Sequence, residues 1–260
     1  MENRVGWIDS HAHLCEESFN EDISEVIQRA KEANITRILV ITCGLDQVER
    51  ALQLKQDYDI IDLAIGLHPE EADEVDDVML ERLDKLLASK QFIAVGEIGL
   101  DHYWRKDNKD KQREVFMAQI ALANKHELPI LVHSREASQD TYQTLKENPV
   151  KRKGIMHCYS GSIEMASEYI KLGYYISLAG PVTFKNAVTP VEVAQHVGIE
   201  HLFIETDSPF MAPVPKRGKR NESAYVAYVG EKIASLKEIE NEEFIKQMNI
   251  NYQTLFRSYV

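Results

Sequence analysis

Short apolar segments alternate along the whole chain with longer segments in which apolar residues recur at helical spacing. Apolar runs of this length are typical of buried strands, and the helical spacing is typical of helices that cover a sheet. Clear helical patterns lie at residues 21–34 and 114–127, and two further helices are predicted near 222–237 and 242–257. The eight apolar runs are 5–9, 37–43, 61–67, 92–100, 129–133, 154–158, 174–180 and 202–207. The pattern therefore predicts a parallel sheet of eight strands with covering helices.

Two folds are compatible with eight strand–helix units, a closed (β/α)8 barrel and an open, doubly wound sheet. The positions of polar residues favour the barrel, because histidines and carboxylates follow or end five of the eight runs. These residues are His11 and His13 after the first run, Glu97 late in the fourth, and His133, His157 and Asp207 at the ends of the fifth, sixth and eighth. Only a closed barrel gathers these five strand ends at one rim. We therefore expect an α/β fold, a (β/α)8 or TIM barrel, with a metal site at the C-terminal ends of the strands.

Length and composition predict one domain over residues 1–260. This length is close to the roughly 250 residues of a typical (β/α)8 barrel, and no linker or repeat divides the chain. The chain has no apolar stretch of about 18 residues and no apolar signal-peptide run near its start, so we expect no contact with a membrane. Cys15, Cys43 and Cys158 are an odd, scattered set, which indicates reduced thiols in a cytoplasmic protein. The oligomeric state is left open, and a monomer is compatible with the sequence.

The six polar residues at the strand ends are candidate metal ligands. His11 and His13 are two residues apart in extended backbone, so their side chains project to the same side. Glu97 lies in an apolar run, where a carboxylate is costly to bury unless it meets a cation. Each residue also has an ordinary alternative: a surface pair for His11 and His13, a salt bridge for Glu97, strand-end histidines for His133 and His157, and a turn cap for Asp207.

Taken together, four imidazoles and two carboxylates suit Zn, Mn, Fe or Co, and suit Mg less well. One cation does not need six ligands, so we expect two divalent cations bridged by a carboxylate. Two such cations lower the pKa of an attacking water. Glu97 and Asp207 are the candidate catalytic residues, and Asp207 is expected to take or relay the proton of that water.

The net charge of −12, from 30 basic and 42 acidic residues, opposes broad attraction to nucleic acid. It does not exclude a nuclease, because bound cations can neutralise some carboxylates. A basic loop directly after the eighth run departs from this balance and is a candidate phosphate-binding segment, although most charge runs are solvated loops. Its cations are Lys216, Arg217, Lys219 and Arg220. Arg135, two residues after His133, is a second candidate for phosphate contact, with a salt bridge at a helix start as the alternative.

Several motifs resemble those of the TatD family of metal-dependent DNases, which belongs to the amidohydrolase-like (β/α)8 metal hydrolases. They are DSHAHL (9–14), GLHPE (66–70), GEIGLDHYW (96–104), LPILVHSREA (128–137), HCYSG (157–161), ETDSPFMAPVPKRGKRNES (205–223) and N-x-x-x-L-F (251–256). The resemblance implies one metal held by His11, His13, Glu97 and Asp207, and a second held by Glu97, His133 and His157. His102, Glu136 and Ser223 depart from the family pattern, which usually has Tyr, Asp and Pro there, and none of these changes removes a ligand.

The resemblance implies a metal-dependent deoxyribonuclease, and a 3′–5′ exonuclease acting on single-stranded DNA. A barrel mouth ringed by loops also receives a strand end more readily than a continuous duplex. Two alternatives stay open, because the same barrel and metals serve other hydrolases. One is a hydrolase of small amides, esters or lactones, and the other is a D-aminoacyl-tRNA deacylase, which removes a misacylated amino acid from tRNA.

Overall fold

Eight parallel strands form the centre of the structure, a computed structural model that describes residues 5–256. The strands are β1 (Trp7–Ala12), β2 (Ile35–Thr42), β3 (Ile61–Ile65), β4 (Ala94–Asp101), β5 (Ile130–Arg135), β6 (Gly154–Met156), β7 (Tyr175–Leu178) and β8 (Leu202–Ile204). Each lies within or overlaps one of the eight predicted runs. Neighbours in the chain are neighbours in the sheet, in the order β1 to β8.

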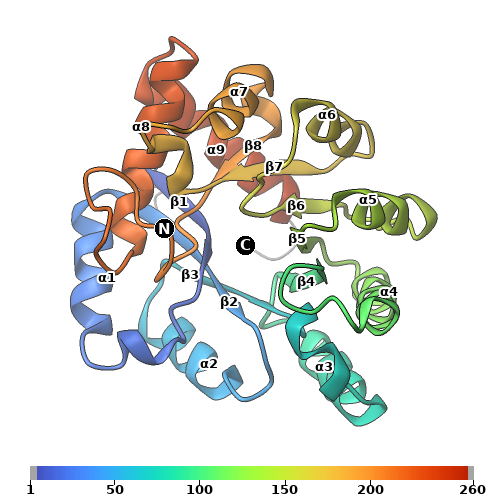
Figure 1. Cartoon of the computed structure of the whole chain (residues 1–260). Helices are drawn as coiled ribbons and strands as arrows, with labels where there is room; N and C mark the ends of the chain where they lie inside the picture. Colours follow the sequence, from blue (N-terminus) through green and yellow to red (C-terminus); the bar gives the residue numbers. More distant parts are fainter. Residues whose placement is uncertain (1–4, 257–260) are drawn as a thin grey trace.

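The sheet closes on itself through the residues just after β8. Ala12 of β1 forms a parallel bridge with Ser208, the His13 amide donates to the Ser208 carbonyl over 2.8 Å, and the Asp207 amide donates to the His11 carbonyl over 2.9 Å. An open, doubly wound sheet would leave these two edges apart, so the predicted barrel is confirmed. Figure 1 shows the strands around a common centre with the helices outside them.

Nine α-helices within residues 5–256 surround the strands. They are α1 (Ile23–Glu32), α2 (Val48–Asp57), α3 (Asp77–Ala88), α4 (Lys109–His126), α5 (Ser138–Glu147), α6 (Ile163–Lys171), α7 (Thr189–His196), α8 (Val226–Leu236) and α9 (Asn241–Phe256). Short 3-10 helices lie at Glu17–Phe19, Pro69–Glu74, Gly180–Thr183, Ile199–His201 and Ser223–Tyr225. The two helices predicted after the last strand correspond to α8 and α9, and residue 257 of that prediction lies outside the described residues. Among the helices described, none is both long and apolar enough to span a membrane.

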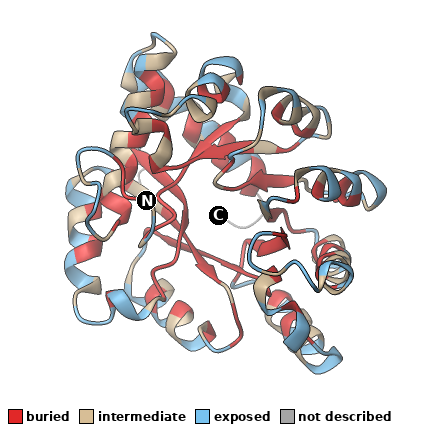
Figure 2. Cartoon of the chain, viewed as in Figure 1, coloured by how far each residue is buried: buried red, intermediate tan, exposed pale blue. Residues whose placement is uncertain are grey.

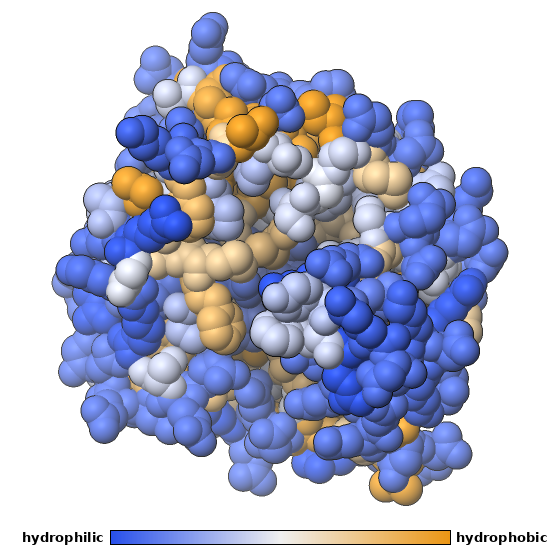
Figure 3. Space-filling model, in the orientation of Figure 1, coloured by the Kyte–Doolittle hydropathy of each residue, from blue (hydrophilic) through white to orange (hydrophobic). Residues whose placement is uncertain are grey.

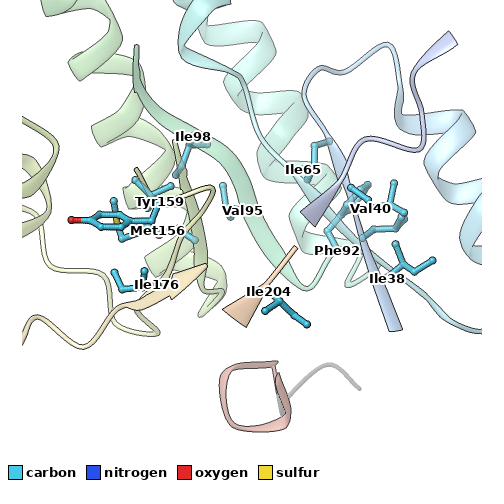
Figure 4. Close-up of a cluster of buried hydrophobic side chains, with 14 of the residues drawn as sticks. Ile38, Val40, Ile65, Phe92, Val95, Ile98, Met156, Tyr159, Ile176 and Ile204 are labelled. Carbon is cyan, nitrogen blue, oxygen red and sulfur yellow. The ribbon is translucent and has the colours of Figure 1, made fainter. Parts of the chain in front are cut away.

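Both faces of the strands are buried, as expected for a parallel sheet inside a ring of helices (Figure 2). One face packs against the helices, and Figure 4 shows part of this layer, with Ile38, Val95 and Ile176 among its side chains. The other face fills the barrel interior, where Ile8 and Leu131 lie in the first half of their strands and Phe203 lies in the middle of β8.

Helix α9 contributes Tyr252, Leu255 and Phe256 to this interior cluster. The hydroxyl of Tyr252 donates to Asp62 over 2.7 Å and thereby satisfies a buried carboxylate there. Apolar side chains therefore fill the N-terminal end of the barrel, which leaves the C-terminal ends of the strands to the polar residues.

Candidate metal centre

The six predicted ligands converge at the C-terminal ends of the strands. His11 lies in β1 and His13 directly after it, Glu97 lies in β4, His133 in β5, and His157 and Asp207 follow β6 and β8. His11 is fully buried and Glu97 is 3% exposed, so these polar groups contact one another instead of solvent. Gly99 allows the close approach of β4 and β5 here, because its φ is +149° and a Cβ on it would collide with the His133 carbonyl.

Four ligand atoms lie close together on one side of the Glu97 carboxylate. Nε2 of His11 lies 3.2 Å from Nε2 of His13 and 3.2 Å from Oε2 of Glu97. Oδ1 of Asp207 lies 3.1 Å from Nε2 of His13 and 3.8 Å from Nε2 of His11. Ligand atoms bound to one cation at about 2.0–2.2 Å are about 3.0–3.5 Å from each other. The spacing of His11, His13 and Glu97 therefore fits one divalent cation, and Asp207 lies beside His13 at its edge; His11, His157 and Asp207 form another group that could hold a metal ion.

A second group lies on the other side of the Glu97 carboxylate. Its Oε1 is 2.6 Å from Nδ1 of His133 and 2.6 Å from Nε2 of His157, and these two nitrogens are 3.4 Å apart. Oε2 of the same carboxylate faces His11 and His13. One carboxylate thus presents one oxygen to each group, which is the arrangement that a bridging ligand requires.

The outer ring nitrogens of His133 and His157 each have a carboxylate partner. Nε2 of His133 lies 3.0 Å from Oδ2 of Asp101, and Nδ1 of His157 lies 3.2 Å from Oε1 of Glu205. Carboxylates in this position fix the tautomer and orientation of ligand histidines in metal sites. Asp101 also accepts hydrogen bonds from the backbone amides of Tyr103 and Trp104, so it both orients His133 and caps the following loop.

The two N-terminal histidines are held differently. Nδ1 of His13 lies 3.5 Å from Sγ of Cys43, which follows β2. Nδ1 of His11 is buried and has no hydrogen-bond partner among the described residues. Behind this pair, the buried carboxylate of Asp9 accepts hydrogen bonds from the amide and the hydroxyl of Thr206. Burial raises the pKa of Asp9 to about 7 despite these hydrogen bonds.

Electrostatics of the cluster reflect the dense packing of imidazoles and carboxylates. Burial alone would raise the pKa of Glu97, but His157, His11 and His133 together lower it well below its ordinary value. Burial opposes the charged form of His157, yet the charges of Glu97 and Glu205 raise its pKa well above its ordinary value. For Asp207, burial is outweighed by the hydrogen bond and charge of His13, and its pKa falls to about 2. Both ligand carboxylates are therefore ionised at neutral pH and available to a cation.

Sequence reasoning did not single out His68, Glu205 or Asp9 as parts of the site. Nε2 of His68 lies 3.6 Å from Oε1 of Glu97, and His68, Glu97 and His133 form a further group that could hold a metal ion. His68 directly follows the third apolar run, so the strand-end rule that selected His133 also applies to it. Glu205 and Asp9 are carboxylates in apolar runs, and the burial argument used for Glu97 applies to both.

The cationic residues predicted to bind substrate have different surroundings. The guanidinium of Arg135 lies 4.3 Å from the ring centroid of Tyr103, that of Arg217 lies 4.4 Å from Phe184, and Nζ of Lys216 lies 5.1 Å from Tyr225. Arg220 forms an ion pair of 2.6 Å with Asp22, and its guanidinium lies over Phe19. Lys219 is exposed. Arg220 therefore has an intramolecular carboxylate partner that the other four cations lack within residues 5–256.

A closed (β/α)8 barrel with buried imidazoles and carboxylates at the C-terminal strand ends defines the class of protein as a metal-dependent hydrolase. Residues 8–257 match the family model described as TatD related DNase, and the chain belongs to this family. It is 46% identical to the metal-dependent hydrolase YabD of Bacillus subtilis strain 168, over 96% of this chain and 98% of that protein. The metal-dependent hydrolase YcfH of Escherichia coli K12 is 35% identical over 96% of this chain and 95% of its own length.

Solved structures agree with this assignment. The crystal structure of YJJV, a TatD homologue from Escherichia coli K12, superposes with a TM-score of 0.92 at 30% identity, and covers 96% of this chain and 98% of its own. An engineered lactonase with organophosphate hydrolysis activity superposes with a TM-score of 0.69 at 12% identity, over 97% of this chain and 96% of its own. At that identity the second similarity shows a shared fold alone.

Proposed function

We propose that this protein hydrolyses phosphodiester bonds of DNA with two divalent cations, and that it removes nucleotides from the 3′ end of a single strand. The proposal of two cations rests on the carboxylate of Glu97, whose two oxygens face two separate groups of histidines. One cation would be held by His11, His13, Glu97 and Asp207, and the other by Glu97, His133 and His157. The identity of the cations, Mg, Mn, Zn, Fe or Co, is left open.

When bound, the cations supply Lewis acidity to the phosphoryl oxygen and lower the pKa of the attacking water. The protein residues do the rest. Asp207 is ionised at neutral pH, which supports a role in taking or relaying the proton of the attacking water. Asp101 and Glu205 orient His133 and His157 toward Glu97.

The position of Arg135 supports the proposal that the substrate contains phosphate. It lies two residues after His133 on the same strand, is exposed, and has no ion pair with any carboxylate in residues 5–256. Lys216, Arg217 and Lys219 add positive charge in the loop after β8. In a chain of net charge −12, these cations are enough to bind a few phosphates and too few to hold a long duplex. A strand end is therefore the better substrate.

The cellular setting belongs to the same proposal. Cys15, Cys43 and Cys158 are all free thiols, as expected in a reducing compartment such as the cytoplasm. The site is assembled from one chain, so a monomer suffices for the proposed activity.

The deciding experiment compares a 5′-labelled linear single-stranded oligonucleotide with circular single-stranded DNA of similar composition. We expect a ladder of one-nucleotide steps from the linear strand in the presence of Mg, Mn, Zn or Co, and an intact circle. Equal cutting of the circle would show an endonuclease. Hydrolysis of chromogenic esters or of an aminoacyl-tRNA ester, with DNA left intact, would show one of the two alternative hydrolases.

A further inference from the structure

Two aromatic side chains are exposed directly beside the metal cluster. Tyr103 and Trp104 follow β4 and are 42% and 59% exposed, and their rings pack edge to face with centroids 4.8 Å apart. The neighbouring His102 is 6% exposed, so it is not available to a ligand in the same way. Large aromatic rings that serve only packing are ordinarily buried, whereas this pair presents its surface to solvent.

The same carboxylate fixes these aromatic residues and the metal cluster. Oδ1 of Asp101 accepts hydrogen bonds from the backbone amides of Tyr103 and Trp104 over 2.9 and 2.8 Å. Oδ2 of Asp101 lies 3.0 Å from Nε2 of His133. Asp101 itself is fully buried, so the loop carrying the two rings is anchored at a set position relative to Glu97 and His133. A ligand that stacks on these rings therefore meets a largely pre-organised surface.

Arg135 completes the arrangement. Its guanidinium lies 4.3 Å from the ring centroid of Tyr103 and 5.4 Å from that of Trp104. Asp101 and Arg135 are paired in the β4–β5 register, so the cation lies beside the aromatic loop for structural reasons. A π surface next to a cation without an acidic partner complements a nucleobase with its adjoining phosphate. A small uncharged ester would need neither the aromatic surface nor the cation.

An apolar ring also lies across the barrel from this loop. Phe210, three residues after Asp207, is 55% exposed, and its ring centroid lies 6.2 Å from that of His13. Strands β4 and β8 are opposite each other in a closed barrel of this order, so the two aromatic loops flank the cluster. Figure 3 shows apolar surface across the centre of this face, between more hydrophilic rims.

We propose that Tyr103, Trp104 and Arg135 form a nucleotide subsite, in which an aromatic ring stacks on the terminal base of a single strand and Arg135 binds the adjacent phosphate. This inference rests on the proposed nuclease function and names the part of the strand that the site recognises. It also predicts that the base, and not only the phosphate chain, contributes to affinity.

The test uses the metal-loaded protein and two short single-stranded oligonucleotides with phosphorothioate links at the 3′ end to slow hydrolysis. The two differ only in the 3′-terminal residue, which is a nucleotide in one and an abasic residue in the other. Binding is followed by tryptophan fluorescence, which reports mainly on Trp104 because the other tryptophan, Trp7, is 6% exposed. Base–aromatic stacking contributes about 1–3 kcal/mol per base, so the abasic strand should bind about 5- to 150-fold more weakly and quench less.

Variants assign the effect to the aromatic pair. The double variant Tyr103→Leu/Trp104→Leu keeps the backbone amides that bind Asp101, and we expect it to fold, to keep its metal content and to bind both strands equally. Because that variant lacks Trp104, its binding is measured by anisotropy of a dye on the 5′ end. Trp104→Phe retains a stacking ring and should keep most of the difference, whereas Arg135→Gln should weaken both strands alike.

The outcomes separate this inference from the proposed function. Equal binding of both strands by the wild-type protein, or an abasic penalty that persists in the double variant, overturns the subsite. If the wild-type protein still shortens single strands in that case, the nuclease function stands without it. If the wild-type protein neither binds the two strands nor cuts DNA, both the subsite and the proposed nuclease function are overturned.

Discussion

Oδ2 of Asp101 lies 3.0 Å from Nε2 of His133, whose other ring nitrogen lies 2.6 Å from Glu97. The carboxylate therefore holds the imidazole from outside while the inner nitrogen faces the proposed metal position. The arrangement resembles the carboxylate–histidine pairs that orient ligands in metal sites generally. It also means that β4 supplies both a proposed ligand, Glu97, and the residue that orients the ligand on β5.

Replacing Asp101 with Asn should weaken metal binding without removing a ligand. The amide cannot accept from the His133 ring as a charged carboxylate does, so the imidazole loses part of its orientation and basicity. Loss of such a partner typically costs about 10- to 100-fold in metal affinity or activity. Competition against a chelator would measure the affinity for the more weakly bound of the two cations. The exposed Asp140, which faces His102 instead, offers Asp140→Asn as a control that should leave the affinity unchanged.

Replacing Glu97 with Ala should remove the link between the two groups of ligands. We expect the protein to lose both cations or to bind them independently, and the hydrolytic rate to fall by at least about 100-fold, as when one electrostatic catalytic element is removed. Metal content by elemental analysis and turnover on a labelled oligonucleotide would be measured on the same sample. Near-normal turnover by a preparation free of wild-type protein would rule out the bridging role.

Metal binding should release protons at neutral pH. In the metal-free cluster, Glu97 and Glu205 raise the pKa of His157, and Cys43 and Asp207 raise that of His13, in both cases against the effect of burial. Both rings therefore carry a proton at pH 7 that a cation must displace, and metal affinity should rise as the pH increases through neutrality. Titration calorimetry in buffers with different ionisation enthalpies gives the number of protons released. A value of zero would mean that both imidazoles are already neutral before the metal binds.

The fold could be predicted from the sequence because its signal is repeated eight times. Each strand is a short apolar run buried on both faces, and the polar strand ends distinguish a closed barrel from an open sheet. Closure itself depends on residues after β8, since Ser208 and Asp207 rather than a long β8 pair with the end of β1. The run 202–207 was therefore longer than the strand, which ends at Ile204.

The candidate site could be predicted only where the strand-end rule was applied. His133 and His157 were found this way, but His68 was missed although it follows the third run. Which carboxylate orients which histidine could not be read from the sequence. That Asp101 serves His133 and Glu205 serves His157 depends on the register between neighbouring strands and on side-chain rotamers, which apolar periodicity does not determine. Similarly, the ion pair between Arg220 and Asp22 joins residues nearly two hundred positions apart, and a local charge run gives no sign of it.

The ion pair between Arg220 and Asp22 divides the cations of the basic loop into two sets. Lys216, Arg217 and Lys219 have no carboxylate partner within residues 5–256, so they are free to bind phosphates. Each phosphate contact with a single strand contributes about 0.7 to the slope of log affinity against log salt. Replacing the three by Gln should therefore flatten the slope by up to about 2 and raise KM for an oligonucleotide. Hydrolysis of a small uncharged ester, if any occurs, should be unchanged.

Arg220→Gln should behave differently, because its charge is already paired with Asp22. We expect little change in the salt slope and a loss of about 0.2–1 kcal/mol in unfolding free energy, as for other partly exposed ion pairs. Asp22→Asn removes the same pair, together with the 3.5 Å contact between Asp22 and Arg29, without removing a cation from the loop, so it is a useful control and should lower the melting temperature by at least as much. Urea unfolding and binding between low and physiological salt would measure both effects. A slope that Arg220→Gln flattens as much as the triple variant would mean that Arg220 leaves Asp22 for the substrate, and an unchanged slope in the triple variant would make the loop an ordinary solvated surface.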